Sequence, residues 1–157
     1  MRIGIIVHSH TGHTLGVAEK LMRKLQTEGH DVSLERVSVV DEDPNKMTNI
    51  QLASNPDIQA YEGLIFAAPV RGFSLSPVMK LYLSQLGTLN GKKVYGFVTQ
   101  SFPFPWMGGN QSIKQLKRAC QEKDVEVIET GIINWSNKNR ESRIEELIEG
   151  ICANFSA

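Results

Sequence analysis

The sequence has few cysteines, no excess of charge of either sign and no long apolar run. Its two cysteines, Cys120 and Cys152, form no Cys-x-x-Cys motif and cannot build a disulfide framework. Lysine plus arginine equals aspartate plus glutamate at 17 each, so no basic field predicts binding to nucleic acid or anionic lipid. No apolar run approaches the roughly 20 residues that cross a bilayer, and no signal-peptide core is present. We therefore expect a cytoplasmic protein with reduced thiols.

Several common catalytic motifs are also missing. The phosphate-binding pattern Gly-x4-Gly-Lys-Ser/Thr does not occur, and Gly-x-Gly-x-x-Gly does not follow the first strand. There is no serine nucleophile elbow. His8, His10 and His13 match no standard zinc spacing and have no carboxylate partners nearby, so no metal site is expected. These absences argue against a nucleoside triphosphatase, a Rossmann dinucleotide site, a serine hydrolase and a zinc enzyme.

The apolar pattern alternates between strand and helix along 157 residues, of which 41% are hydrophobic. This content is enough for the core of a single domain spanning residues 1–157. Strand-length apolar runs occur at 2–7, 32–37, 63–68, 93–98 and 125–133. Apolar residues recur with helical period in 17–25, 78–86, 113–120 and 144–155. The alternation predicts an α/β fold, a three-layer sandwich around a five-stranded parallel sheet.

Residues 40–61 are the least regular stretch. They contain Pro44 and Pro56, and we expect them to cross one edge of the sheet, with a short helix around Met47–Ala53.

The turn at 9–14, Ser-His-Thr-Gly-His-Thr, lies between the first strand and the first helix, which is expected to begin near His13. Ser9, Thr11 and Thr14 alternate around Gly12 where a helix N-terminus offers unpaired amides. Hydroxyls, free N–H groups and the helix dipole together suit a phosphate, and the alternative is simple helix capping.

Two further loops follow the carboxyl ends of apolar strands, at 69–76 and 99–110. Ligands of open parallel sheets bind at this edge. The first loop carries Arg71 and Phe73, and the second carries Phe102, Phe104 and Trp106. Loop aromatics suit a flat ring, with a hydrophobic plug or an oligomer contact as the alternatives. A binding region that suits a phosphate at one end and a flat ring at the other matches the shape of flavin mononucleotide (FMN).

Residue by residue, the chain resembles the flavodoxin-like family. Ile5, Ile6, Ser9, Gly12, Thr14, Ala18 and Leu21 match the phosphate-loop pattern, in which Val7 replaces a usual aromatic. Tyr61–Phe66 followed by Ala68-Pro69 resembles the third strand and its flavin loop. The resemblance covers essentially the whole chain, and it implies the sheet order 2-1-3-4-5 and the short-chain form.

Pro69–Ser74 and Gly108-Gly109 look more like the quinone reductases of the tryptophan-repressor-binding-protein type. We expect Gly108-Gly109 to permit close backbone approach and to start a helix capped by Asn110 or Ser112. The expected phosphate contacts are Ser9, His10, Thr11, Gly12, His13 and Thr14. The expected ring contacts are Pro69, Val70, Arg71, Gly72, Phe73, Ser74, Thr99, Gln100, Ser101, Phe102, Trp106, Gly108 and Gly109.

Arg71 separates two hypotheses about electron transfer. A guanidinium near the ring would stabilise the two-electron anionic form, which favours hydride chemistry over one-electron shuttling. A solvated surface arginine is the alternative. The sequence therefore predicts an FMN reductase that uses NAD(P)H and passes electrons to a quinone or another small acceptor. A one-electron carrier serving redox proteins and a cofactor-free interaction module remain open. The loop aromatics also make a homo-oligomer plausible.

Overall fold

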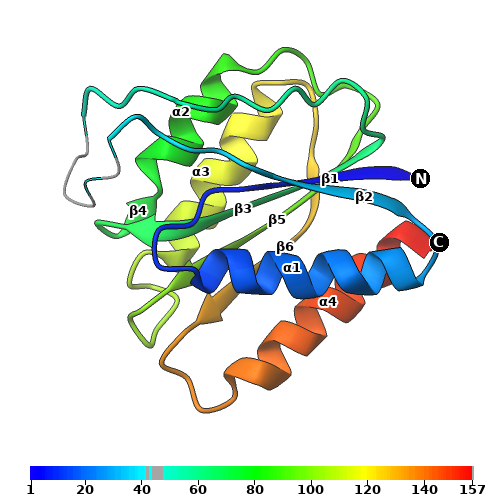
Figure 1. Cartoon of the computed structure of the whole chain (residues 1–157). Coiled ribbons are helices and arrows are strands. Elements are labelled where there is room, and N and C mark those ends of the chain that lie inside the picture. The colour runs from blue at the N-terminus through cyan, green and yellow to red at the C-terminus, as the bar shows by residue number, and fades with distance from the viewer. Residues whose placement is uncertain (42, 44–47, 157) are drawn as a thin grey trace.

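The computed structural model describes residues 1–41, 43 and 48–156. A parallel sheet lies between two layers of helices (Figure 1). The sheet order is β2-β1-β3-β5-β6, and each neighbouring pair is parallel. These strands are β1 (Arg2–Val7), β2 (Asp31–Arg36), β3 (Gly63–Arg71), β5 (Lys93–Gln100) and β6 (Val127–Asn134). The predicted order, 2-1-3-4-5 in the numbering of the expected strands, is confirmed.

Helices cover both faces of the sheet. One face carries α1 (His13–Thr27) and α4 (Arg140–Ser156), and the other carries α2 (Pro77–Gln85) and α3 (Gly109–Gln121) (Figure 1). Strand β1 shows why the central strands are apolar along their length. Ile3 and Ile5 pack in the core with α1 and α4, whereas Ile6 packs in the core with α2 and α3. A parallel strand buried on both faces leaves no position for a polar side chain.

The loop predicted at 69–76 is instead mostly a β-hairpin. Strand β3 continues to Arg71, and β4 (Ser74–Leu75) pairs with it antiparallel. The two turn residues, Gly72 and Phe73, have φ values of 57° and 60°. Two successive positive φ angles are typical of a tight type I′ turn. A strand of two residues has no detectable period, so the apolar pattern could not predict this hairpin.

The short helix expected around Met47–Ala53 is wrong over its described part. Leu52 forms an isolated antiparallel bridge with Val39, and the N–H of Val40 donates to Gln51 O at 2.9 Å. Met47 itself, like Pro44, lies outside the described residues. Leu52 packs against the core beside α2 and α3, so tertiary packing selects an extended backbone here.

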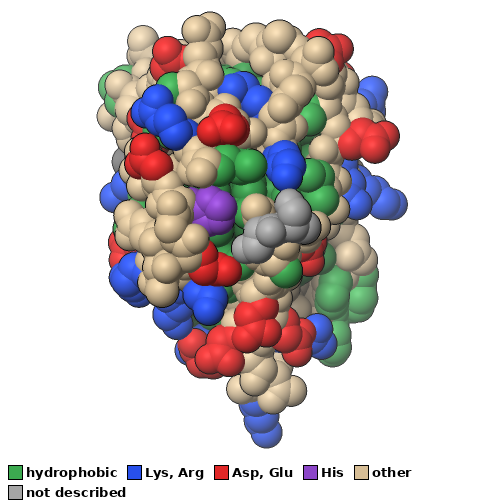
Figure 2. Space-filling view, turned by 90° about the vertical axis from the view of Figure 1, so that its right-hand side faces the viewer, with side chains coloured by type: hydrophobic (Ala, Val, Ile, Leu, Met, Phe, Trp, Pro, Cys, Tyr) green, Lys and Arg blue, Asp and Glu red, His purple; other side chains and the backbone are tan. Residues whose placement is uncertain are grey.

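The two cysteines are buried, Cys152 in the core on the side of α1 and α4 and Cys120 in the core on the side of α2 and α3. Burial raises the pKa of each thiol to about 12. Seen from the side where both termini lie, the surface mixes acidic and basic side chains without a field of one sign (Figure 2). Among the described residues, no helix combines the length and the apolar character that a membrane crossing requires.

Candidate functional site

The turn between β1 and α1 places a helix N-terminus at the carboxyl edge of the sheet. Gly12 is the N-cap with a φ of 93°, a left-handed conformation that glycine adopts without strain. Ser9 Oγ accepts hydrogen bonds from the amides of Gly12 and Leu15 at 3.1 and 3.3 Å. No described residue accepts a hydrogen bond from the amide of His13 or Thr14. Two main-chain donors and the positive end of the helix dipole are therefore available beside Gly12, where the space is open.

The three hydroxyls of this turn lie in different surroundings. Ser9 is buried and supports the turn from inside. Its Oγ accepts from the amide of Leu15 in the first turn of α1, so for Ser9 the alternative interpretation, helix capping, is the one that the structure shows. Thr14 is buried against the sheet, where its Oγ1 lies 2.7 Å from Thr99 Oγ1. Thr11 is exposed, as is its neighbour His10. Of the three hydroxyls, that of Thr11 lies on the surface at the helix N-terminus.

Contacts between side chains join the three loops at the carboxyl edge. His8 Nδ1 lies 2.8 Å from Ser76 Oγ and links the end of β1 to the start of α2. The rings of Phe73 and Phe102 stack with centroids 5.4 Å apart, which links the hairpin to the loop after β5. With the pair of Thr14 and Thr99, these contacts bring the three predicted groups of site residues into one region.

The hairpin lies directly against the N-terminus of α3. Gly108 is the N-cap of α3 with a φ of 116°. A Cβ at Gly108 would lie 2.7 Å from Phe73 Cα and 2.6 Å from Val70 Cγ1, so only glycine fits. The close approach predicted here is confirmed. The predicted caps Asn110 and Ser112 are wrong, because no side chain caps α3 and Ser112 Oγ donates backward to Gly108 O.

Aromatic side chains are unusually exposed around these loops. The exposed fractions are 56% for Phe73, 48% for Phe102, 53% for Phe104 and 73% for Trp106. Phe104 and Trp106 also stack, with centroids 6.0 Å apart. Large apolar rings gathered on a surface indicate a binding region.

The buried side chain of Gln100 supports the loop that carries Phe102, Phe104 and Trp106, called the aromatic loop below. Its side-chain Nε2 donates to Phe102 O and Phe104 O, each at 2.7 Å. Its Oε1 is buried and has no hydrogen-bond partner among the described residues. Gly109 leaves room for this amide, since a Cβ there would lie 2.4 Å from Gln100 Oε1. The predicted site residue Gln100 thus shapes the loop rather than facing outward.

Positive charge gathers around the buried His8 ring. The pKa of His8 falls to about 4, first because of burial and then because of the positive charges of Arg71, His10 and Arg36. The ring is therefore neutral at pH 7. Arg36, at the end of β2, also donates to Ser9 O at 3.4 Å. Sequence reasoning missed Arg36. A signal was present, because Arg36 is the last residue of β2 and therefore lies at the same edge of the sheet as the end of β1.

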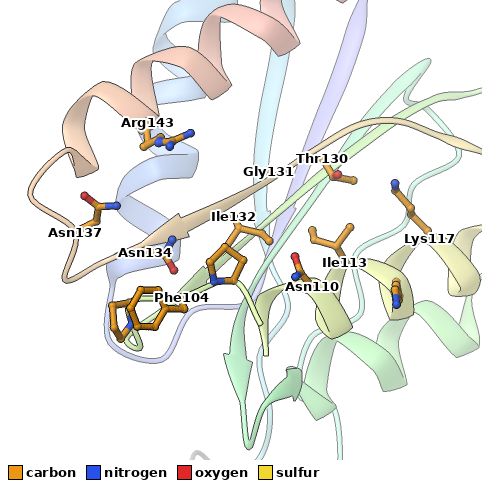
Figure 3. A pocket seen from close by; sticks show the side chains of 13 residues that line it. Phe104, Asn110, Ile113, Lys117, Thr130, Gly131, Ile132, Asn134, Asn137 and Arg143 are labelled. Atoms are coloured by element: carbon orange, nitrogen blue, oxygen red, sulfur yellow. The ribbon is translucent and has the colours of Figure 1, made fainter. Parts of the chain in front are cut away.

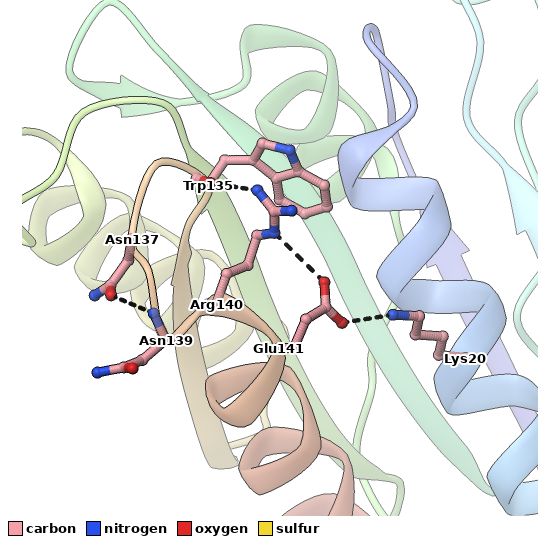
Figure 4. A network of polar contacts seen from close by, with 6 residues as sticks. All are labelled: Lys20, Trp135, Asn137, Asn139, Arg140 and Glu141. Atoms are coloured by element: carbon pink, nitrogen blue, oxygen red, sulfur yellow. Dashed lines mark hydrogen bonds and ion pairs between the residues drawn. The ribbon is translucent and has the colours of Figure 1, made fainter.

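Trp135 is a second residue that sequence reasoning missed. It follows β6, and its ring stacks on His13 with centroids 3.9 Å apart. Arg140 lies 4.5 Å over the same ring and donates to Trp135 O at 2.6 Å. Figure 4 shows the chain of contacts running on from Arg140 to Glu141 and Lys20 of α1. The hydrogen bond from Lys20 lowers the pKa of Glu141. This network fixes the loop after β6 and the start of α4 against α1, at His13 and at Lys20.

The described residues contain no group of three or more His, Cys, Asp or Glu side chains that could hold a metal ion. What they do assemble is a set of main-chain donors, guanidinium groups and exposed rings. That set fits a molecule with an anionic end and a flat aromatic end.

Comparison with known sequence families finds no matching family profile. One curated relative, named NAD(P)H dehydrogenase (quinone), from Archaeoglobus fulgidus, is 26% identical over 100 residues. The match covers 56% of this chain and 52% of the relative, so the chain spans about half the relative's length.

Solved structures show the fold. A flavoprotein from Lactobacillus acidophilus in complex with FMN superposes with a TM-score of 0.61 at 21% identity, covering 93% of this chain and 97% of that one. Oxidised flavodoxin 1 from Bacillus cereus superposes with a TM-score of 0.72 at 16% identity, covering 99% and 97%. The chain has the flavodoxin-like fold that the sequence predicted.

Proposed function

We propose that the chain binds FMN at the carboxyl edge of its sheet and acts as an NAD(P)H-dependent two-electron reductase of a quinone or another small acceptor. The observation that carries the proposal is the convergence of free helix N-terminal amides, guanidinium groups and exposed aromatic rings at one edge. The Lactobacillus flavoprotein that shares the fold is a complex with FMN, and the Archaeoglobus relative is named for NAD(P)H and quinone.

The phosphate would be held at the start of α1. The amides of His13 and Thr14 would donate to it, as would the exposed hydroxyl of Thr11. Arg36 would add positive charge, since it already acts on the nearby His8 ring, and the exposed His10 lies in the same turn. Anions are stabilised at helix N-termini by these donors and by the dipole.

The flat ring would lie beside the hairpin and the aromatic loop. Phe73 and Phe102 would flank or cover it, after giving up their present stack on each other. Trp106, the most exposed of the four rings, would close over it or contact a second subunit. Aromatic stacking of this kind is favourable by about 0.5–1.5 kcal/mol beyond the area buried.

Bound FMN supplies hydride acceptance from a nicotinamide and donation to an acceptor. Arg71 would act through its charge. It lies at the end of β3, is half-buried, and its positive charge helps to lower the pKa of His8. Near the ring, this charge would stabilise a negative charge there and favour transfer of electrons in pairs.

The experiment is an anaerobic titration of the protein loaded with FMN. We expect NADH or NADPH to bleach the yellow colour and a quinone to restore it. Failure of both nucleotides, together with a stable blue one-electron-reduced form during chemical reduction, would assign a carrier between redox proteins instead. Protein that stays colourless after incubation with FMN would contradict the binding itself.

A further inference from the structure

The last strand of the sheet, β6, has a neighbour on one side only. It pairs with β5 and forms the edge of the sheet. A hollow of about 750 Å³ follows its open side, between α3 and the start of α4. Figure 3 shows Lys117, Ile113 and Asn110 on one side of β6 and Arg143 on the other. The hollow therefore runs along the strand and is open to a second chain lying beside it.

The main chain of β6 presents hydrogen-bonding groups to this hollow. The N–H of Trp135 donates to Gln100 O in β5. Because alternate residues of a parallel strand direct their main-chain groups to opposite sides, those of Thr130 and Ile132 point away from β5. Neither residue makes a main-chain hydrogen bond to any other described residue on that side. The irregularity between β5 and β6 lies earlier, at Val94/Tyr95, so this stretch is regular.

Positive charge lines the same hollow. Lys114, Lys117 and Arg143 contribute side chains, and no aspartate or glutamate is among the lining residues. Arg143 itself forms an ion pair with Glu146, Nη1 to Oε2 at 3.9 Å, which is long and largely exposed, and such pairs contribute little to stability. The walls thus carry two lysines and one ion-paired arginine. Glu129 and Glu146 line a neighbouring hollow that shares Thr130, Ile132 and Arg143 with this one, so the lysines of α3 supply the unbalanced positive charge.

From this combination we propose that the open edge of β6 binds an extended, acidic peptide segment of a partner protein by strand addition. The segment's main chain pairs with Thr130 and Ile132, and its carboxylates lie against Lys114 and Lys117 of α3 and Arg143 of α4. Strand addition takes affinity from main-chain hydrogen bonds and specificity from side chains. The site lies next to the proposed cofactor site and shares Phe104 of the aromatic loop with it.

The shape of the hollow favours an extended segment over a compact anion. From Thr130 to Asn134 the strand covers about 13 Å, at roughly 3.3 Å per residue. A small anion would use the lysines and leave the row of strand donors and acceptors unpaired. Unpaired edges invite another strand, and natural edges are usually blocked by charge or proline on the edge strand itself or by irregular pairing. Strand β6 carries no lysine, arginine or proline, and its one charged residue is Glu129.

The test measures binding of two labelled hexapeptides to the full-length protein by fluorescence anisotropy. One alternates Glu and Val, and the other alternates Gln and Val. We expect the Glu peptide to bind about tenfold more tightly at low salt and to lose most of that advantage at high salt. Equal binding of the two peptides would overturn the proposal.

Two pairs of variants separate charge from strand pairing. The double change Lys114→Gln with Lys117→Gln should weaken the Glu peptide about fivefold to tenfold. The matched double change Arg118→Gln with Lys123→Gln, outside the hollow, should leave it within about twofold. Thr130→Pro removes one outward N–H and should weaken binding about fivefold, whereas Thr130→Val keeps that N–H and should not.

Three results would contradict the inference. The first is full binding by a folded Thr130→Pro variant, checked by circular dichroism, which would leave a simple anion site. The second is displacement of the bound peptide by millimolar inorganic phosphate, which would likewise indicate a site for a small anion. The third is a dimer in sedimentation that the lysine changes dissociate, since a second copy would then occupy the edge. If Thr130→Pro does not fold, the comparison of the two peptides and the lysine variants still test whether the hollow binds an acidic segment.

Discussion

Thr14 Oγ1 and Thr99 Oγ1 share a hydrogen bond of 2.7 Å in a buried position between α1 and β5. The bond joins the start of the first helix to the end of a strand 85 residues later in the chain. It therefore fixes the proposed phosphate-binding turn at 9–14 relative to the end of β5, from which the aromatic loop begins.

Thr14→Val should lower the free energy of unfolding by about 1–3 kcal/mol, because the Thr99 hydroxyl is left buried without a partner. Valine keeps the branched shape, so packing changes little. Thr99→Val should cost a similar amount. The double variant should cost clearly less than the sum, as measured by denaturant unfolding. Strict additivity would show that the two hydroxyls do not depend on each other.

His8 should make the protein less stable in acid. Its pKa is about 4 in the folded chain, against 6.5 for an unperturbed histidine. Between these values the unfolded chain binds more protons, so acid favours unfolding. The contribution of His8 is complete above pH 6.5 and is lost as the pH falls toward 4, by about 3 kcal/mol.

The measurement is the free energy of unfolding at pH 7, 5.5 and 4.5 for the wild type and for His8→Gln. The variant should lose stability less steeply over this window, since it has no imidazole to protonate. Parallel curves for the two proteins would show that another group carries the acid sensitivity.

Arg71→Glu should lower the two-electron reduction potential of bound FMN, on the order of tens of millivolts, because it places a negative charge where a positive one stood. Turnover with NAD(P)H should slow while FMN remains bound. Arg118→Glu, on the exposed face of α3, is the matched charge reversal and should leave the potential unchanged. Potentials are measured by equilibration with a reference dye, and an unchanged value for Arg71→Glu would place its charge away from the ring.

Trp135→Leu should lower the free energy of unfolding by about 1–2 kcal/mol. The change removes the stack on His13 and the contact with the Arg140 guanidinium. The other tryptophan provides the control, since Trp106 is 73% exposed and Trp106→Leu should stay within about 0.5 kcal/mol. Thermal and denaturant melts compare the two, and equal losses would argue against a structural role for the Trp135 stack.

The sequence was sufficient for the sheet and the helices because long apolar runs carry a clear period. Ile3, Ile5 and Ile6 mark a strand buried on both faces, and the structure places them in two opposite cores. The turn at Gly12 was predictable too, because glycine and hydroxyls between a strand and a helix favour one backbone path.

Short or purely tertiary features were beyond that reasoning. Strand β4 has two residues, too few for any period. The apolar residues around Leu52 suited a helix, yet a bridge to Val39 holds them extended. Trp135 gave no local signal, because its partner His13 lies 122 positions away in the chain and meets it only once the sheet is formed.

The contact of Gly108 with Phe73 has a mechanical consequence. With no side chain between them, the tip of the hairpin at Phe73 lies against Gly108, the N-cap of α3, so the hairpin has no room to move closer to this helix. A ligand ring that separated the stacked side chains of Phe73 and Phe102 would therefore have to move the hairpin away from α3, because it cannot move the hairpin closer to that helix.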